Sequence, residues 1–199
     1  MQWFVAMMLI PLASEAAVSF RHEVLPILTR QGCNAGTCHG SPSGKGGFAL
    51  SLFAFDAEAD HTVLTKDYRG RRIDPVDPDA SLLLRKPSTA IAHRGGLKLP
   101  KASREYRILR QWIAEGCRAD EPGSPTCVGI LLKHEGPATL RWPQPSTQIK
   151  VIARFANGTT RDVSHLAQFT SSDEAIATVQ PDGTITGVRR GVAAVMVRY

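Results

Sequence analysis

The chain has 199 residues, of which 43% are hydrophobic and 21% are charged, and its net charge is +6. This is the composition of a globular protein with one or two small domains. The positive charge favours anionic partners such as acidic proteins, polyanions or lipid headgroups. No Lys/Arg-rich run with interleaved aromatic residues is present, so nucleic acid is not an expected partner.

Residues 1–17 have the pattern of a secretory signal peptide. An apolar run is followed by small residues, and cleavage is expected after Ala16 or Ala17. No Lys or Arg precedes the run, which leaves open an uncleaved signal anchor. We expect no other transmembrane span. The protein is therefore expected to be exported, to the periplasm or the cell surface.

The first predicted domain covers residues 18–119 and begins with an amphipathic helix. Ser19 is its predicted cap. Its apolar side chains recur at helical spacing, at Phe20, Val24, Ile27 and Leu28. Pro26 lies inside this run and predicts a kink or a shifted start, because proline lacks the amide proton that the helix needs.

The motif Cys33-Asn-Ala-Gly-Thr-Cys38-His39 follows this helix. Two cysteines followed directly by a histidine suit covalent haem attachment, with the thiols on the haem vinyl groups and His39 as the proximal iron ligand. Four residues separate the cysteines here, where two are usual. Gly36 is predicted to take a positive φ so that the longer loop bulges outward. A zinc knuckle and a Cys33–Cys38 disulfide are the alternatives.

The rest of this domain predicts one extended stretch and three helices. Alternating apolar residues from Phe48 to Phe55 predict the extended segment. Asp56 is the predicted cap of a helix towards residue 65, Asp79 of a helix over 80–85, and Ser103 of the last helix.

The sixth iron ligand is predicted by elimination and position. No methionine lies between His39 and the end of the domain. His93, in a Gly-rich loop before the last helix, is the predicted distal ligand, and His61 is the alternative; an open or water-bound position also remains. Arg71 and Arg72 are candidates for the haem propionates, although a solvated basic turn explains them better.

Residues 120–127 form a predicted linker between the domains. Cys117 and Cys127 flank it and could pair in an oxidising compartment, or remain free thiols.

The second predicted domain covers residues 128–199. Residues 148–155 alternate as in a half-buried strand, and Asn157-Gly158 and Asp182-Gly183 predict turns. Short strands with frequent turns favour a β-sandwich. The chain ends at Tyr199 within the last predicted strand, which leaves open a truncation there.

Both halves resemble known families. Residues 20–118 are similar to the planctomycete-type cytochrome c domain in the stretches 33–40, 46–53, 71–72, 81–84, 86–87, 93–96 and 112–116. Residues 128–199 resemble a bacterial Ig-like domain of the second group in the stretches 155–164, 177–179 and 183–187. The resemblance implies two domains, an all-α cytochrome c-like haem domain and an all-β Ig-like sandwich.

The expected function is therefore that of an exported c-type cytochrome module. It would carry one covalent haem c and transfer electrons, with the Ig-like domain as spacer or docking unit and a redox protein of unknown identity as partner. No nucleophile–base constellation is recognisable, so the chain by itself is not expected to be an enzyme. One alternative is a cell-surface binding protein whose Ig-like domain contacts a glycan or protein. A weaker one is a haem-dependent enzyme with an open sixth position.

Overall fold

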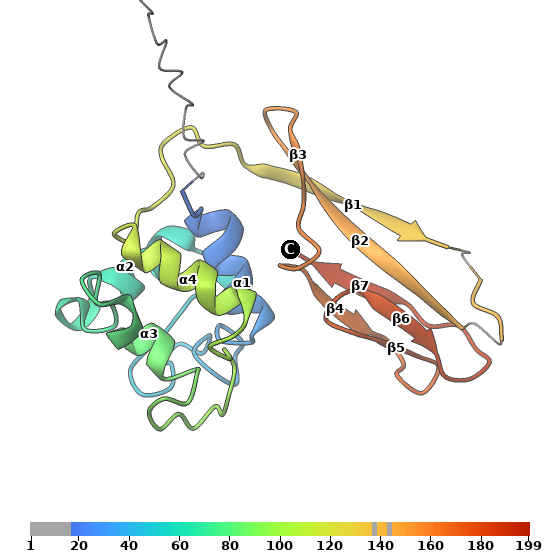
Figure 1. Cartoon of the computed structure of the whole chain (residues 1–199), viewed down its shortest axis with the longest axis horizontal. Coiled ribbons are helices and arrows are strands. Elements are labelled where there is room, and N and C mark those ends of the chain that lie inside the picture. Colours follow the sequence, from blue (N-terminus) through green and yellow to red (C-terminus); the bar gives the residue numbers. More distant parts are fainter. Residues whose placement is uncertain (1–16, 137–138, 143–144) are drawn as a thin grey trace, which may run out of the picture.

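The computed structural model describes residues 17–136, 139–142 and 145–199. The predicted signal peptide, except for its last residue, lies outside this part. Figure 1 shows a helical half, formed by the chain before residue 115, beside a β half, formed by the chain after residue 126. No helix in the described part is long and apolar enough to cross a membrane.

The helical half consists of short helices joined by long loops. Its α-helices are α1 (Leu25–Arg30), α2 (Ala57–Thr65), α3 (Leu82–Arg85) and α4 (Arg104–Ala114). A π-helical turn (Phe20–Val24) precedes α1, and 3-10 turns cover Leu52–Ala54, Asp67–Gly70 and Pro78–Ala80. The helical core is formed by apolar residues that include Val24, Ile27, Leu64, Leu84, Leu109, Trp112 and Ile113, all at most 1% exposed.

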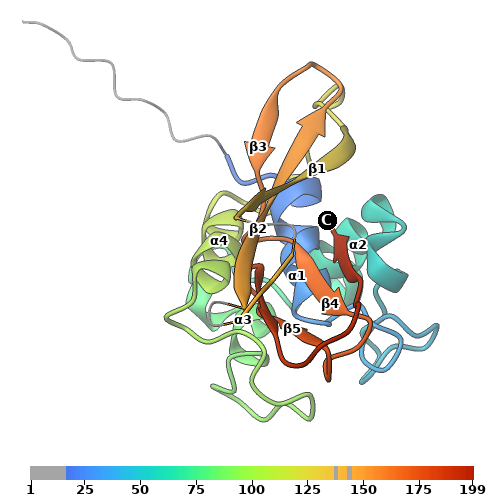
Figure 2. The same cartoon turned by 90° about the vertical axis from the view of Figure 1, so that its right-hand side faces the viewer.

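The β half is entirely antiparallel. Its strands are β1 (Cys127–Glu135), β2 (Ser146–Phe155), β3 (Thr160–Asp162), β4 (Gln168–Ser171), β5 (Ala177–Val179), β6 (Thr184–Gly187) and β7 (Val195–Arg198). Five of them form one sheet in the order β1-β2-β6-β5, with β3 also on β2, and β4 pairs with β7. Figure 2 shows this half from its outer side, with β4 in front of α1.

The predicted all-α haem domain is wrong. The described chain is 25% helix and 22% strand, and no all-α haem domain is evident. The four α-helices have six, nine, four and eleven residues. Between them the backbone turns repeatedly through left-handed conformations, for example at Gly44, Gly46 and Gly47. The predicted helices are present at nearly the expected positions, over 57–65, 82–85 and 104–114, and it is the long irregular loops between them that depart from an all-α domain.

Several predicted local signals are confirmed. The side chains of Ser19, Asp56 and Ser103 each accept a hydrogen bond from the backbone amide three residues later, as helix caps do. Asn157-Gly158 forms the turn between β2 and β3, and Gly183 has φ 84° in the turn between β5 and β6. These signals depend on one or two residues each, so the tertiary structure does not override them.

Two other local predictions are wrong. Asp79 does not cap a helix: its carboxylate accepts hydrogen bonds from the Tyr106 hydroxyl and the Arg110 guanidinium, at 2.7 Å each. The expected extended stretch ends in the turn Leu52–Ala54, where Phe53 has φ 52°. Its amide donates to the carbonyl of Asn34, so a contact with the Cys-Cys-His loop replaces strand pairing.

The carbonyl of His22 is where the two halves meet. It accepts hydrogen bonds from the Arg161 guanidinium (3.0 Å) and the Tyr199 hydroxyl (2.9 Å) of the β half. Pro26 follows on the same segment, where the π-helical turn gives way to α1 and proline supplies no amide proton. The start of the first helix is thus an attachment point for the β half.

A second attachment lies at the end of α1. The Arg30 guanidinium donates to the carbonyl of Pro181 in the β5–β6 turn (2.8 Å), and it lies 3.6 Å from the carboxylate of Glu105 on α4. The half-buried His165, which precedes β4, faces the same group of charges. Three cations, Arg104 of α4, Arg30 of α1 and Arg161 of β3, oppose its protonation, and Asp162 favours it.

We expect His165 to make the fold sensitive to acid. Burial, together with the three arginines, lowers its pKa from 6.5 to about 4. The unfolded chain takes up the proton near pH 6.5 and the folded chain only near pH 4, so stability is lost as the pH falls through this window. Chemical denaturation at a series of pH values should show a smaller loss in His165→Gln. The wild type and His165→Gln should differ in their loss of unfolding free energy by less than about 1.4 kcal/mol per pH unit, because the ring is partly exposed. Equal pH dependence in both proteins would contradict this assignment.

Candidate functional site

The Cys-Cys-His loop is a compact turn that continues from α1. Gly32, with φ 71°, ends the helix, and the amide of Cys33 donates to the carbonyl of Leu28. The amide of His39 donates to the carbonyl of Cys33 at 2.9 Å. The four intervening residues therefore fold back, so that the first cysteine and the histidine are hydrogen-bonded neighbours.

Asn34 and Gly40 hold this turn closed. Asn34 is 1% exposed, and its side-chain amide donates to the Thr29 hydroxyl at 2.9 Å. A Cβ atom at Gly40 would lie 2.0 Å from the carbonyl oxygen of Asn34, so only glycine fits there. The prediction for Gly36 is wrong: it is not among the residues with positive φ, and it does not produce the bulge.

All four cysteines are free thiols in the structure. Neither the alternative Cys33–Cys38 disulfide nor a Cys117–Cys127 pair is present. Burial raises the pKa of Cys33 to about 11, with a further contribution from Cys38, while nearby Lys98 acts in the opposite direction. Burial likewise raises the pKa of Cys117 to about 11. Both groups are protonated thiols at neutral pH.

His39 is held in one orientation. Its Nδ1 lies 2.9 Å from the carbonyl oxygen of Phe48, and the Phe48 ring packs against the imidazole with ring centres 4.5 Å apart. Because a carbonyl only accepts hydrogen bonds, Nδ1 carries the proton and Nε2 keeps its lone pair. Burial lowers the pKa of His39, and the neighbouring His93 and Arg72 contribute to the shift.

His93 has the same arrangement in the loop before α4. Its Nδ1 lies 2.8 Å from the carbonyl oxygen of Gly96, so its Nε2 also keeps the lone pair. The rings of His39 and His93 have centres 6.5 Å apart and planes inclined by only 19°. A Cβ atom at Gly95 would lie 2.8 Å from Cε1 of His93, so a glycine there makes room for the ring.

His61 lies in a different environment. Its Nε2 donates to the carbonyl of Cys117 at 2.7 Å, and its ring packs edge-on against Phe20 and Trp112. The nitrogen that would bind a metal is used to hold the end of α4 against α2. These contacts give His61 a structural role in the helical core.

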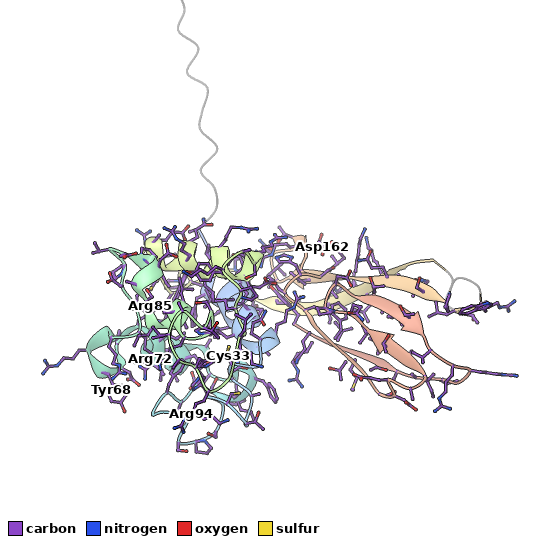
Figure 3. All side chains as sticks on the ribbon, turned by 60° about the horizontal axis from the view of Figure 1, so that its bottom comes forward. Cys33, Tyr68, Arg72, Arg85, Arg94 and Asp162 are labelled. Carbon is purple, nitrogen blue, oxygen red and sulfur yellow. The ribbon has the colours of Figure 1, made fainter. Side chains whose placement is uncertain are left out.

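Arg72 is part of the scaffold, whereas Arg71 is exposed. The buried guanidinium of Arg72 donates to the carbonyls of Val63 (2.8 Å) and Gly47 (3.4 Å). It also lies over the Phe48 ring, 4.6 Å from its centre. Arg72 thus supports the residue that orients His39, and its donors are already engaged. Figure 3 shows Arg72 in the same part of the molecule as Cys33.

Sequence reasoning missed the groups that orient the two histidines. The carbonyls of Phe48 and Gly96 carry no side-chain signal, and Gly95 was noted only as part of a Gly-rich loop. Lys98, whose charge lowers the pKa of Cys33, belongs to no recognisable sequence motif. The pair Gly95-Gly96 is the one usable sequence signal, because glycines close to a histidine permit close backbone approach.

No three His, Cys, Asp or Glu side chains gather into a metal site anywhere in residues 17–136, 139–142 and 145–199. A structural zinc ion needs about four such ligands, so the zinc-knuckle alternative has no support here. Haem differs, because the porphyrin supplies four nitrogens and the protein needs to provide only the axial ligands. A pair of histidines is therefore sufficient for haem iron.

A cleft of about 630 Å³ lies elsewhere, between the two halves. Its lining includes Arg21, Phe53, Phe55, Cys127 and Arg198. The Arg198 guanidinium lies over the Phe53 ring, 4.3 Å from its centre. Neither His39 nor His93 borders this cleft, so it is separate from the histidine pair.

Comparisons with known proteins give no family for this chain: no protein-family model and no curated protein matches it. The resemblance to the planctomycete-type cytochrome c domain and to the Ig-like domain of the second group is therefore wrong as an assignment. The short helices of the first half and the lack of a multi-residue metal site in the described part agree with this correction. What remains is the local chemistry of the residues themselves.

We expect Gly40 to be essential for the loop and Gly36 to be dispensable. Gly40→Ala places a methyl group against the Asn34 carbonyl and should lower the free energy of unfolding by about 2 to 4 kcal/mol. Gly36→Ala meets nothing closer than 3.9 Å and should change it by less than about 1 kcal/mol. Denaturant titrations of the two variants compare them directly. Equal destabilisation would show that the close approach at Gly40 does not constrain the fold.

Proposed function

We propose that the chain binds one haem covalently through Cys33 and Cys38, with His39 and His93 as the two iron ligands, and transfers single electrons outside the cytoplasm. The single observation that carries the proposal is the nearly parallel His39–His93 pair, with ring centres 6.5 Å apart. The proposal uses the chemistry of these four residues and does not depend on a family assignment.

The spacing of the histidine pair suits two ligands on one metal ion. A metal–imidazole bond of about 2 Å, added to the ring size, separates the centres of two opposed imidazoles by about 6 Å. Both rings also offer the correct nitrogen, since each Nδ1 donates to a carbonyl and each Nε2 is left as the acceptor. Two side chains from distant segments share this arrangement, which favours a common ligand over separate surface roles.

The two free thiols supply the covalent attachment. Each thiol adds across one vinyl group: the sulfur bonds to one carbon, and the thiol proton goes to the other. This addition needs no external oxidant. It does require both cysteines to be reduced, as they are here. The hydrogen bond between His39 and Cys33 keeps the first thiol and the proximal imidazole in one rigid unit.

The bound haem would supply an iron centre that gains or loses one electron. The protein's part is to hold both ligands still, so that little rearrangement accompanies the change of charge. Phe48 does this for His39 through its carbonyl and its ring, and Arg72 supports Phe48. Two imidazoles favour the oxidised iron more than a His/Met pair does, so the expected potential is comparatively low.

Arg71 and Arg72 divide into different roles. Arg72 donates hydrogen bonds to backbone carbonyls, so its role in this proposal is structural. Arg71 is exposed and can still meet a propionate. An enzymatic haem with an open position is less compatible with the site, because a second imidazole, that of His93, lies 6.5 Å from His39 between ring centres.

A second candidate function is protein binding through the β half. Strand β1 is at the edge of its sheet, and Val128, Leu131 and Leu132 on it are 59%, 44% and 49% exposed. An apolar edge strand can pair with a strand of another protein. This role is compatible with electron transfer, since it uses a different part of the molecule.

Covalent attachment is tested by expression of the full chain together with a haem-attachment system. After denaturation and acid extraction, we expect the haem to stay on the polypeptide. Cys33→Ala combined with Cys38→Ala should abolish this, because no thioether can form. Cys117→Ala combined with Cys127→Ala is the matched control and should retain the haem. Extraction of all the haem into organic solvent would refute the proposal.

The second iron ligand is tested by a pair of histidine variants. His93→Ala should convert the iron from low to high spin with the haem still attached, because His93 is outside the attachment motif. His61→Ala should leave the absorption spectrum nearly unchanged, since its Nε2 is used by Cys117. Gly95→Ala keeps the imidazole but crowds it, and should give a mixture of spin states. A spin change in His61→Ala alone would identify His61 as the ligand.

A further inference from the structure

Two chain segments surround the histidine pair, and both are purely basic. Residues 31–55 carry His39, and residues 80–104 carry His93. Neither segment contains an Asp or a Glu. Their cations are Lys45, Arg85, Lys86, Arg94, Lys98, Lys101 and Arg104. Residues 136–161 of the β half are likewise free of Asp and Glu, so what matters for the site is that both segments carrying its histidines are of this kind.

Four of these cations lie next to the site and are called the basic rim: Lys45, Lys86, Arg94 and Lys98. Lys45 forms a β-bridge with Phe48, whose carbonyl holds His39, and the charge of Lys98 lowers the pKa of Cys33. The ammonium of Lys86 donates to the carbonyl of Ala92, directly before His93 (3.3 Å). Arg94 follows His93 and extends from the outer edge of the helical half (Figure 3).

The positive charge of the rim is not neutralised within the described part of the chain. The ion pairs of the described part involve other residues, for example Asp79 with Arg110 and Glu105 with Arg30. Two carboxylates of the adjoining scaffold are engaged with other groups: Asp67 raises the pKa of Arg72, and Asp60 accepts hydrogen bonds from Ser51. A haem with two propionates would offset two of the four rim charges and leave the surface positive.

We propose that the basic rim docks an acidic protein that exchanges electrons with the His39–His93 site. This inference rests on the function proposed above and names its partner. Charge complementarity around a redox site raises the rate of encounter and brings the donor and acceptor groups together. An acidic protein fits better than an anionic lipid surface, because the rim is a set of loops around the site and not the polar face of an amphipathic helix.

The test uses the full haem-loaded chain and two small redox reagents of opposite charge, anionic ferricyanide and cationic hexaammineruthenium. The rate constant for ferricyanide should fall about tenfold as salt rises, and the rate constant for the cation should not fall. Lys45→Glu combined with Arg94→Glu should lower the ferricyanide rate about tenfold. The control, Lys133→Glu with Arg190→Glu in the β half, makes the same charge change and should lower it less than about threefold.

A haem-independent measurement separates this inference from the proposed function. Poly-L-glutamate should bind the wild-type chain, with or without haem, and binding should weaken about tenfold in the rim variant but not in the control. Loss of haem with rim-dependent binding retained would reject only the proposed function. Attached haem with equal rates and binding in all three proteins would overturn the docking inference. Tighter rim-dependent binding to anionic phospholipid vesicles than to poly-L-glutamate would overturn it in favour of a membrane surface.

Discussion

The contact of the His22 carbonyl with the β half is the interaction on which the arrangement of the two halves depends. The Arg161 guanidinium and the Tyr199 hydroxyl both donate to this partly buried carbonyl. A polar group at such a junction needs a hydrogen-bond partner, because leaving it unpaired costs free energy. The start of the first helical segment and the end of the β half therefore satisfy each other.

The segment of residues 20–30 contacts three parts of the molecule: α4, the β5–β6 turn and the Cys-Cys-His loop. Phe20 stacks on Trp112 of α4, with ring centres 5.4 Å apart. Arg30 donates a hydrogen bond to the β5–β6 turn, and the Thr29 hydroxyl accepts one from the side-chain amide of Asn34. The position of the Cys-Cys-His loop is thus set by the same segment that joins the halves. A loop anchored in this way can hold His39 rigidly although few of its residues belong to regular structure.

The electrostatics of the site follow from burial and from backbone carbonyls. Among the residues that the structure describes, no carboxylate orients His39 or His93; the carbonyls of Phe48 and Gly96 do so. A neutral acceptor fixes the tautomer without adding negative charge, so the surroundings of the site stay positive. Because these partners are neutral carbonyls, they leave each Nε2 available and add no negative charge that would offset the cations of the basic rim.

By itself the sequence determined the features that depend on a few adjacent residues: the caps at Ser19, Asp56 and Ser103, the Asn157-Gly158 turn, and the Cys-Cys-His order with its thiols and imidazole. It also determined which segments are basic. Only the tertiary structure decided the rest. The sequence predicted His93 as the partner of His39 by elimination and position, but not the carbonyls that orient the two rings. The scaffold role of Arg72 and the contact of His61 with Cys117 likewise join residues far apart in the chain through backbone carbonyls, which every residue possesses. The helices of the first half follow the sequence closely, at 57–65, 82–85 and 104–114, whereas the long loops between them take shapes that only long-range contacts decide, because no local pattern encodes those contacts.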